Sequence, residues 1–284
     1  MQKLIYDLDP SIENNIEAIN ALESGKVLHI QNDTFQLRPA ETMLLTPQIL
    51  DKKSKNISYE KNKNKLSGLS VEYVSQHNVM LEMMRRYADF TEQRLKSIFP
   101  DYNAQVKTGR TSYRPAEIYG RKTSKRKDDT RLHVDSFAAT PVNGLRILRF
   151  FCNINPHNQA RIWHLGEQFT QVLEYFAHTI KPYRPAYAKL LHALKINRSM
   201  ITNYDHKMLQ LHDGMKSSDE YQLQVTKHRV EFAPYSSWIV FTDYVSHAAL
   251  SGQFVLEQTF YIPVSAMRNP DLSPIKQLNS WWAV

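Results

Sequence analysis

Strand-like runs on both sides of a helical block constrain the fold of this 284-residue chain more than any other feature. Apolar residues at helical spacing predict helices from 166 to 215. Runs of aromatic and β-branched residues predict strands before and after that block, at 145–155, 228–233, 237–242 and 254–262. This order favours a closed or sandwiched antiparallel β body with helices outside it. It excludes the regular strand–helix alternation of a doubly wound sheet.

The N-terminal third has a different pattern. Apolar residues three, four or seven apart between Val71 and Phe99 predict a long amphipathic helix that ends at Pro100. The segment 52–65 is rich in Lys, Asn and Ser, so we expect an exposed loop there. Residues 1–50 mix short apolar runs with Pro and Asp, which indicates strand and helix pieces packed on a larger body. We expect one elaborated domain over the whole chain.

The charge balance favours an anionic partner. Lys and Arg outnumber Asp and Glu by 36 to 28, for a formal net charge of +8. The densest basic run is Arg121–Lys127, which fits either a solvated loop or an anion-binding segment. Cys152 is the single cysteine, which excludes an intrachain disulfide and fits a reducing compartment. Because no secretory signal and no run of about 18 apolar residues occurs, we expect a cytoplasmic protein with at most peripheral membrane contact.

The pair His133 and Asp135 is the sharpest candidate for chemistry. In an extended chain, residues two apart point to the same side, so both side chains can reach one metal ion. Two His and one carboxylate on one face of an octahedron leave three positions open, as in non-haem Fe(II) oxygenases. His247 is the candidate third ligand, because it follows the predicted strand 237–242 where a barrel mouth could bring it opposite His133. His206 and His212, in a predicted helix, are the rivals.

If the metal is iron, the co-substrate 2-oxoglutarate needs a cation for its far carboxylate. Arginine matches a carboxylate with two parallel hydrogen bonds. Arg149 lies in an apolar predicted strand and shares parity with Leu145 and Ile147, so we expect it, and not Arg146, to face the interior. Arg114 and Trp163 are further candidates for the pocket, although a loop ion pair and a core indole explain them equally well.

Several motifs resemble the Kdo (3-deoxy-D-manno-oct-2-ulosonic acid) 3-hydroxylase family of Gram-negative bacteria. They are Arg126–Asp135, Arg146–Phe150 with Asn153–Pro156, Arg161–Trp163 before Gly166–Glu167, and Val245–Ala248 with Gly252–Gln253 and Leu256–Phe260. The resemblance spans most of residues 105–265, whereas the first hundred residues agree only in general layout.

The resemblance implies an Fe(II)- and 2-oxoglutarate-dependent dioxygenase that is mainly β with packed helices. Its core would be a double-stranded β-helix (jelly-roll, cupin-like) over 105–265, interrupted by the insertion 166–215, with an N-terminal part to residue 104 and a tail over 266–284. The family hydroxylates C3 of Kdo in the inner core of lipopolysaccharide, using O₂ and releasing succinate and CO₂. By the same matching, His133, Asp135 and His247 would bind iron, and Arg114, Arg149 and Trp163 would contact 2-oxoglutarate.

One departure from related oxygenases concerns the co-substrate arginine, which those enzymes often place about ten residues after the second histidine. Here that window holds Leu256, Glu257 and Gln258 and no cation, so Gln258 or Thr259 is expected to donate a hydrogen bond instead. Two other functions stay open. The acceptor could be a protein or nucleic acid, although no nucleic-acid partner is expected, or the chain could be a non-catalytic β-barrel that binds anionic glycan or lipid.

Overall fold

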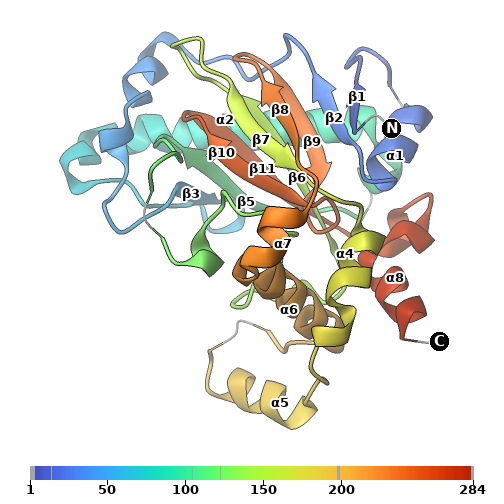
Figure 1. Cartoon of the computed structure of the whole chain (residues 1–284). Helices are drawn as coiled ribbons and strands as arrows, with labels where there is room; N and C mark the ends of the chain where they lie inside the picture. The colour runs from blue at the N-terminus through green and yellow to red at the C-terminus, as the bar shows by residue number, and fades with distance from the viewer. Residues whose placement is uncertain (1–3, 14, 104, 122, 197–198, 283–284) are drawn as a thin grey trace.

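Two β-sheets that face each other form the body of the protein (Figure 1). The computed structural model describes residues 4–13, 15–103, 105–121, 123–196 and 199–282. The large sheet has the strand order β1-β2-β9-β6-β11-β5-β3-β4, and the small sheet has the order β10-β7-β8. The strands are β1 Ile5–Asp7, β2 Val27–Ile30, β3 Ile57–Glu60, β4 Lys65–Ser67, β5 Lys107–Arg114, β6 Arg146–Asn153, β7 Arg161–Leu165, β8 His228–Phe232, β9 Ser237–Phe241, β10 His247–Ser251 and β11 Val255–Ile262.

The central strands confirm the expected mainly β, jelly-roll architecture. Strands β5, β11, β6 and β9 pair antiparallel in the large sheet, and β7, β8 and β10 form the opposing small sheet. The chain therefore passes repeatedly from one sheet to the other, which is how a double-stranded β-helix closes its body. An aromatic cluster fills the space between the sheets. Phe151 and Trp238 from the large sheet pack against Trp163 and Phe232 from the small one.

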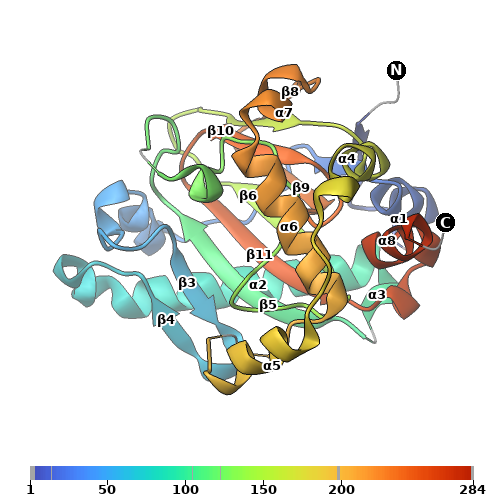
Figure 2. The same cartoon turned by 60° about the horizontal axis from the view of Figure 1, so that its bottom comes forward.

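The long N-terminal helix is confirmed as α2, His77–Ile98, which a 3₁₀ turn over Val71–Gln76 precedes. Its apolar face, which includes Met80, Met84 and Tyr87, is buried against the outer face of the large sheet. The Tyr87 hydroxyl donates a hydrogen bond to the backbone oxygen of Phe150 at 3.0 Å. Figure 2 shows α2 running beneath β5 and β11.

The predicted helical insertion is present and is longer than expected. It contains α4 Phe169–Phe176, α5 Pro185–Ala193, α6 Asn203–Ser217 and α7 Asp219–Gln224. Thr202 caps α6 by accepting a hydrogen bond from the Asp205 backbone N–H. Helix α6 packs on α4, whereas α5 stands away from the sheets at the edge of the molecule (Figure 1).

The remaining helices are short. They are α1 Ile16–Glu23, α3 Pro100–Asn103 and α8 Pro274–Trp281, together with 3₁₀ turns over Pro39–Leu44, Pro47–Ile49, Lys61–Lys63, Lys125–Lys127, Ala177–Thr179, Val264–Ala266 and Pro270–Leu272. No described helix is both long enough and apolar enough to cross a bilayer.

The prediction of an exposed loop over 52–65 was wrong. This segment contains β3 and the start of β4, and β3 pairs with β5 at the edge of the large sheet. Ile57 and Tyr59 are buried and alternate with the partly buried polar residues Ser58 and Glu60. Two apolar side chains among many Lys and Asn residues are enough for this strand, because only one of its faces meets the core. Strands β1 and β2 likewise extend the other side of this sheet.

Candidate active site and metal centre

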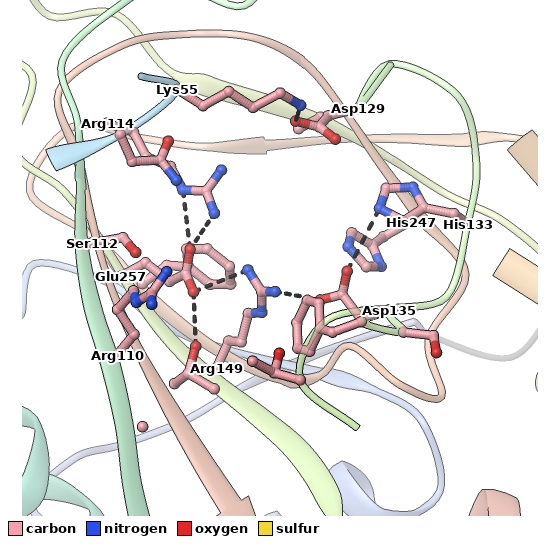
Figure 3. Close-up of a pocket in the computed structure, with 18 of the residues that line it drawn as sticks. Lys55, Arg110, Ser112, Arg114, Asp129, His133, Asp135, Arg149, His247 and Glu257 are labelled. Carbon is pink, nitrogen blue, oxygen red and sulfur yellow. Dashed lines mark hydrogen bonds and ion pairs between the residues drawn. The ribbon is translucent and has the colours of Figure 1, made fainter. Parts of the chain in front are cut away.

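Three predicted ligands meet at the open end of the β body. His133 and His247 form an antiparallel bridge, in which each backbone N–H donates to the other residue's carbonyl, at 3.0 and 2.9 Å. The Asp135 N–H donates to the Thr242 carbonyl at 2.7 Å, and this hydrogen bond fixes the backbone of Asp135 next to that of His133. One donor atom from each of His133, Asp135 and His247 lies within 4.8 Å of the others. The three residues are buried beside a cavity (Figure 3).

Backbone carbonyls orient both imidazole rings. Nδ1 of His133 lies 2.8 Å from the Arg131 oxygen, and Nδ1 of His247 lies 2.8 Å from the Val245 oxygen. Because a carbonyl only accepts, Nδ1 carries the proton in each ring and Nε2 keeps its lone pair. Burial lowers the pKa of both histidines, and the neighbouring His247 lowers that of His133 further. Both rings are therefore held neutral, as metal ligands require.

The third donor is an ionised carboxylate. Burial alone would raise the pKa of Asp135, but the Arg149 guanidinium holds it below its ordinary value. Two neutral nitrogens and one carboxylate oxygen therefore fit a divalent cation of the first transition row. The residues present match the donor set of an iron centre, and the adjoining cavity of about 640 Å³ leaves room for ligands beside it.

A chain of alternating charges lines the wall next to Asp135 (Figure 3). Arg149 lies 2.8 Å from the Asp135 carboxylate and 2.9 Å from the Glu257 carboxylate. Arg114 contacts the other oxygen of Glu257. Burial would raise the pKa of Glu257, but Arg149 and Arg114 hold it below its ordinary value. Glu257 thus fixes two arginines in the cavity and neutralises one of their charges.

Strand β7 contributes two further residues to the cavity. Residues two apart in a strand point to the same side, so Arg161 and Trp163 both face inward. The Trp163 ring stacks on His247, with centroids 5.1 Å apart. Arg161 is buried and donates to the Gly252 carbonyl at 2.7 Å. No carboxylate among the described residues pairs with it, and burial lowers its pKa to about 9.

Several buried donors at this wall have no acceptor among the described residues. They are Nε of Arg149, Nε of Arg161 and the indole Nε1 of Trp163. Buried N–H groups without partners are rare in folded proteins, because each costs about 1–3 kcal/mol. Their presence in one cavity indicates a ligand rich in oxygen acceptors, which fits a dicarboxylate such as 2-oxoglutarate.

The structure brings Arg114, Arg149 and Trp163 to the cavity, but the expectation for Gln258 was wrong. Its side chain accepts a hydrogen bond from Thr111 and donates to backbone carbonyls on the opposite face of β11. Its neighbours Glu257 and Thr259 face the cavity instead. Strand alternation, applied to this segment, would have separated Gln258 from them. Of the rival histidines, His206 contacts Lys181 away from the cavity.

Helix α6 closes the other side of the cavity with His212, the second of the rival histidines, and with Lys216, which the sequence patterns did not single out. His212 lies edge-on to His133, with ring centroids 5.5 Å apart. Lys216, one turn further along, reaches the carboxylate of Asp129. From the basic run, Arg126 and Lys127 line the rim, whereas Arg121 donates to backbone carbonyls and Lys122 is outside the described residues. Residues four apart on a helix face the same way, so the candidate His212 was the available signal for Lys216.

A jelly roll with two histidines and one carboxylate at its open end defines a mononuclear non-haem iron oxygenase. The model of the 3-deoxy-D-manno-oct-2-ulosonic acid (Kdo) hydroxylase family matches residues 7–282. The chain therefore belongs to the Kdo hydroxylase family, whose members are Fe(II)- and 2-oxoglutarate-dependent dioxygenases. This excludes the non-catalytic alternative.

Solved structures of the Kdo hydroxylase KdoO, a non-haem Fe(II) α-ketoglutarate-dependent dioxygenase, are similar over the whole chain. The cobalt(II) complex matches with 39% identity and a TM-score of 0.94, covering 100% of this chain and 96% of that chain. The complex with α-ketoglutarate and Fe(III) matches with 39% identity, a TM-score of 0.93 and the same coverage. The succinate and Fe(III) complex has a TM-score of 0.92, with 39% identity over 100% of this chain and 97% of that one. A search of curated proteins gives no match.

Proposed function

We propose that this enzyme hydroxylates C3 of Kdo in a lipopolysaccharide precursor, and the chemistry of the family's sugar supports that position. In a 3-deoxy-oct-2-ulosonic acid, C1 is the carboxyl carbon and C2 carries no hydrogen when it is glycosidically linked. Carbons 4 to 8 already bear oxygen, so hydroxylation there would give a hydrated carbonyl. Only C3, a methylene, yields a stable hydroxylated sugar.

For the metal, we propose His133, Asp135 and His247 as the three ligands. The single observation that carries this assignment is the convergence of their donor atoms within 4.8 Å, with both Nε2 lone pairs free. Iron with 2-oxoglutarate and O₂ supplies the oxidising chemistry when bound. The chain's own residues keep one side of the metal open to the cavity and hold the ligands in position before the metal arrives.

For 2-oxoglutarate, we propose Arg149, Arg114, Trp163 and also Arg161 as the contacts. The three arginines carry three positive charges, and the Glu257 and Asp135 carboxylates offset part of this charge. The remaining positive charge favours an anionic ligand, because an unpaired anion would be costly to bury. Arg161 is the strongest of these candidates, since its charge has no carboxylate partner among the described residues.

The position of hydroxylation is tested directly by product analysis. Purified enzyme with Fe(II), 2-oxoglutarate and a Kdo-bearing lipid A precursor should add one oxygen to the sugar and release one succinate per turnover. With substrate deuterated at C3, one deuterium should be lost. Succinate release that only a peptide or an oligonucleotide stimulates would overturn the proposed acceptor.

We further propose that the enzyme meets this lipid-linked substrate at the cytoplasmic face of the inner membrane through α5. Between Glu174 and Asp205 the sequence has five Lys and Arg residues and no acidic residue. Leu190, Leu194 and Ile196 on and after α5 are more than half exposed. Exposed apolar residues among basic ones fit the interface of an anionic bilayer, where about 1 kcal/mol per cation is gained.

Binding to vesicles tests this surface. Leu190→Glu with Leu194→Glu should lower binding to phosphatidylglycerol vesicles by at least about tenfold, because both apolar contacts and charge attraction are lost. Val71→Glu with Val74→Glu is the matched control, since these valines are 83% and 70% exposed on a different part of the surface. Equal loss in both double variants would contradict the assignment, as would a wild type that ignores anionic lipid.

A further inference from the structure

Lys216 is a buried cation beside the proposed metal site. It is not among the residues proposed to bind iron or 2-oxoglutarate. It lies on α6, its side chain is 3% exposed, and it lines the cavity. Its ammonium makes one contact among the described residues, to the Asp129 carboxylate at 3.2 Å. An ammonium has three N–H donors, so two remain for a ligand. Burying a cation that uses one donor of three is costly unless a ligand completes its contacts.

The partner of Lys216 is shared with a second lysine. Lys55 contacts the other oxygen of Asp129 at 3.2 Å and donates to the Lys127 carbonyl at 2.7 Å. Two ammonium groups and one carboxylate leave one positive charge on this wall. The shared carboxylate holds Lys216 in place across α6 and the segment before His133.

Different carboxylates hold the lysines and the arginines: Asp129 contacts Lys216 and Lys55, whereas Glu257 contacts Arg114 and Arg149. Figure 3 shows Lys55 and Asp129 on the opposite side of the view from Arg149, which lies next to Asp135, with the two histidines between Asp129 and Asp135. The cavity therefore has two cationic regions next to one metal site. One holds Arg114, Arg149 and Arg161, and the other holds Lys216 and Lys55. A single dicarboxylate co-substrate accounts for the first region only.

The substrate supplies a second anion at a fixed place. In Kdo the C1 carboxyl is bonded to C2, and C2 is bonded to C3, so C1 lies about 2.5 Å from the carbon to be hydroxylated. When C3 faces the metal, this carboxylate must also enter the cavity. There it loses most of its hydration and needs a cation.

We propose that Lys216, held by Asp129, binds the C1 carboxylate of the substrate sugar, with Lys55 as the outer cation of the same subsite. This inference rests on the proposed function, because it takes Kdo as the substrate. Lys216 is a specificity-determining residue here. It selects a sugar acid over a neutral sugar, and by holding the C1 carboxylate it directs C3 toward the metal.

The experiment compares a soluble Kdo glycoside with its C1 methyl ester in two enzymes. Wild-type enzyme should prefer the acid in kcat/KM by about tenfold to a hundredfold, the range for one buried hydrogen bond to a charged group. In Lys216→Met this preference should fall to near unity, while the KM for 2-oxoglutarate stays unchanged. Lys216→Arg should restore part of the preference.

Lys207→Met is the matched control, because Lys207 lies on the same helix and its ammonium packs over the Trp282 ring instead of the cavity. It should keep the wild-type preference. If Lys216→Met keeps the preference for the acid, the inference is overturned, whatever happens to the absolute rate. A wild type that oxidises neither glycoside while it consumes 2-oxoglutarate with another acceptor would instead contradict the proposed function.

Discussion

Asp135→Ala is expected to reduce hydroxylation by more than about 100-fold. Mutation of a residue that only orients a metal ligand costs up to about 100-fold, and loss of a ligand itself should cost more. Asp135 is the single carboxylate of the proposed triad, and its pKa is held below the ordinary value, so it contributes a full negative charge to the metal. Two neutral imidazoles alone bind a divalent cation weakly. Calorimetric titration with Co(II) should show loss of high-affinity binding in this variant.

The control for Asp135→Ala is Asp219→Ala, which removes an exposed carboxylate that pairs with Lys125 and Arg131. That variant should bind Co(II) as wild type does. Asp135→Asn separates charge from shape, because the amide keeps the size of the side chain. If Asp135→Asn retains wild-type metal affinity and turnover, Asp135 is not a ligand.

Arg161→Met is expected to raise the KM for 2-oxoglutarate by about tenfold to a hundredfold, the cost of losing one or more buried hydrogen bonds to a charged group. The same change should leave thermal stability unchanged or increase it. Burial lowers the pKa of Arg161 to about 9, so the folded protein disfavours this charge in the absence of a ligand. A methionine, which is shorter and uncharged, removes that cost.

Opposite effects on stability and on co-substrate affinity distinguish a ligand-binding arginine from a structural one. Arg146 is the contrasting case, since it is fully buried against Asp243 at 2.8 Å and packs over the Phe241 ring. Arg146→Met should lower the melting temperature, because it leaves the Asp243 carboxylate buried without its cation. A lower melting temperature together with an unchanged KM for 2-oxoglutarate in Arg161→Met would show that Arg161 is structural.

The sequence predicts the convergence of His133, Asp135 and His247 because each part of the argument is local. His133 and Asp135 are two residues apart in an extended segment, and His247 follows a strand whose apolar residues are unmistakable. Strand parity also separated Arg149 from Arg146, and the structure places Arg149 in the cavity and Arg146 on the other face. Alternation along one strand needs no knowledge of its neighbours.

The features that could not be predicted from the sequence depend on contacts between segments that are far apart in the chain. Glu257 fixes Arg114 and Arg149 only because β11 lies between β5 and β6. Strand β3 is stable only because β5 and β4 lie on either side of it, so its composition alone indicated a loop. Lys216 reaches Asp129 across 87 residues of sequence. Such pairings follow from strand order and helix packing, and one sequence alone does not give them.

The helical insertion lies between the two histidines proposed as ligands, and its position has an evolutionary consequence. His133 and His247 are locked together by their own backbone bridge, so the segment between β7 and β8 can change in length or sequence without moving them. The oxidising centre comes from strands, whereas Lys216 and the exposed surface of α5 come from helices. Exchange of α4 to α7 between relatives should therefore retarget the enzyme to other acceptors while its consumption of 2-oxoglutarate persists.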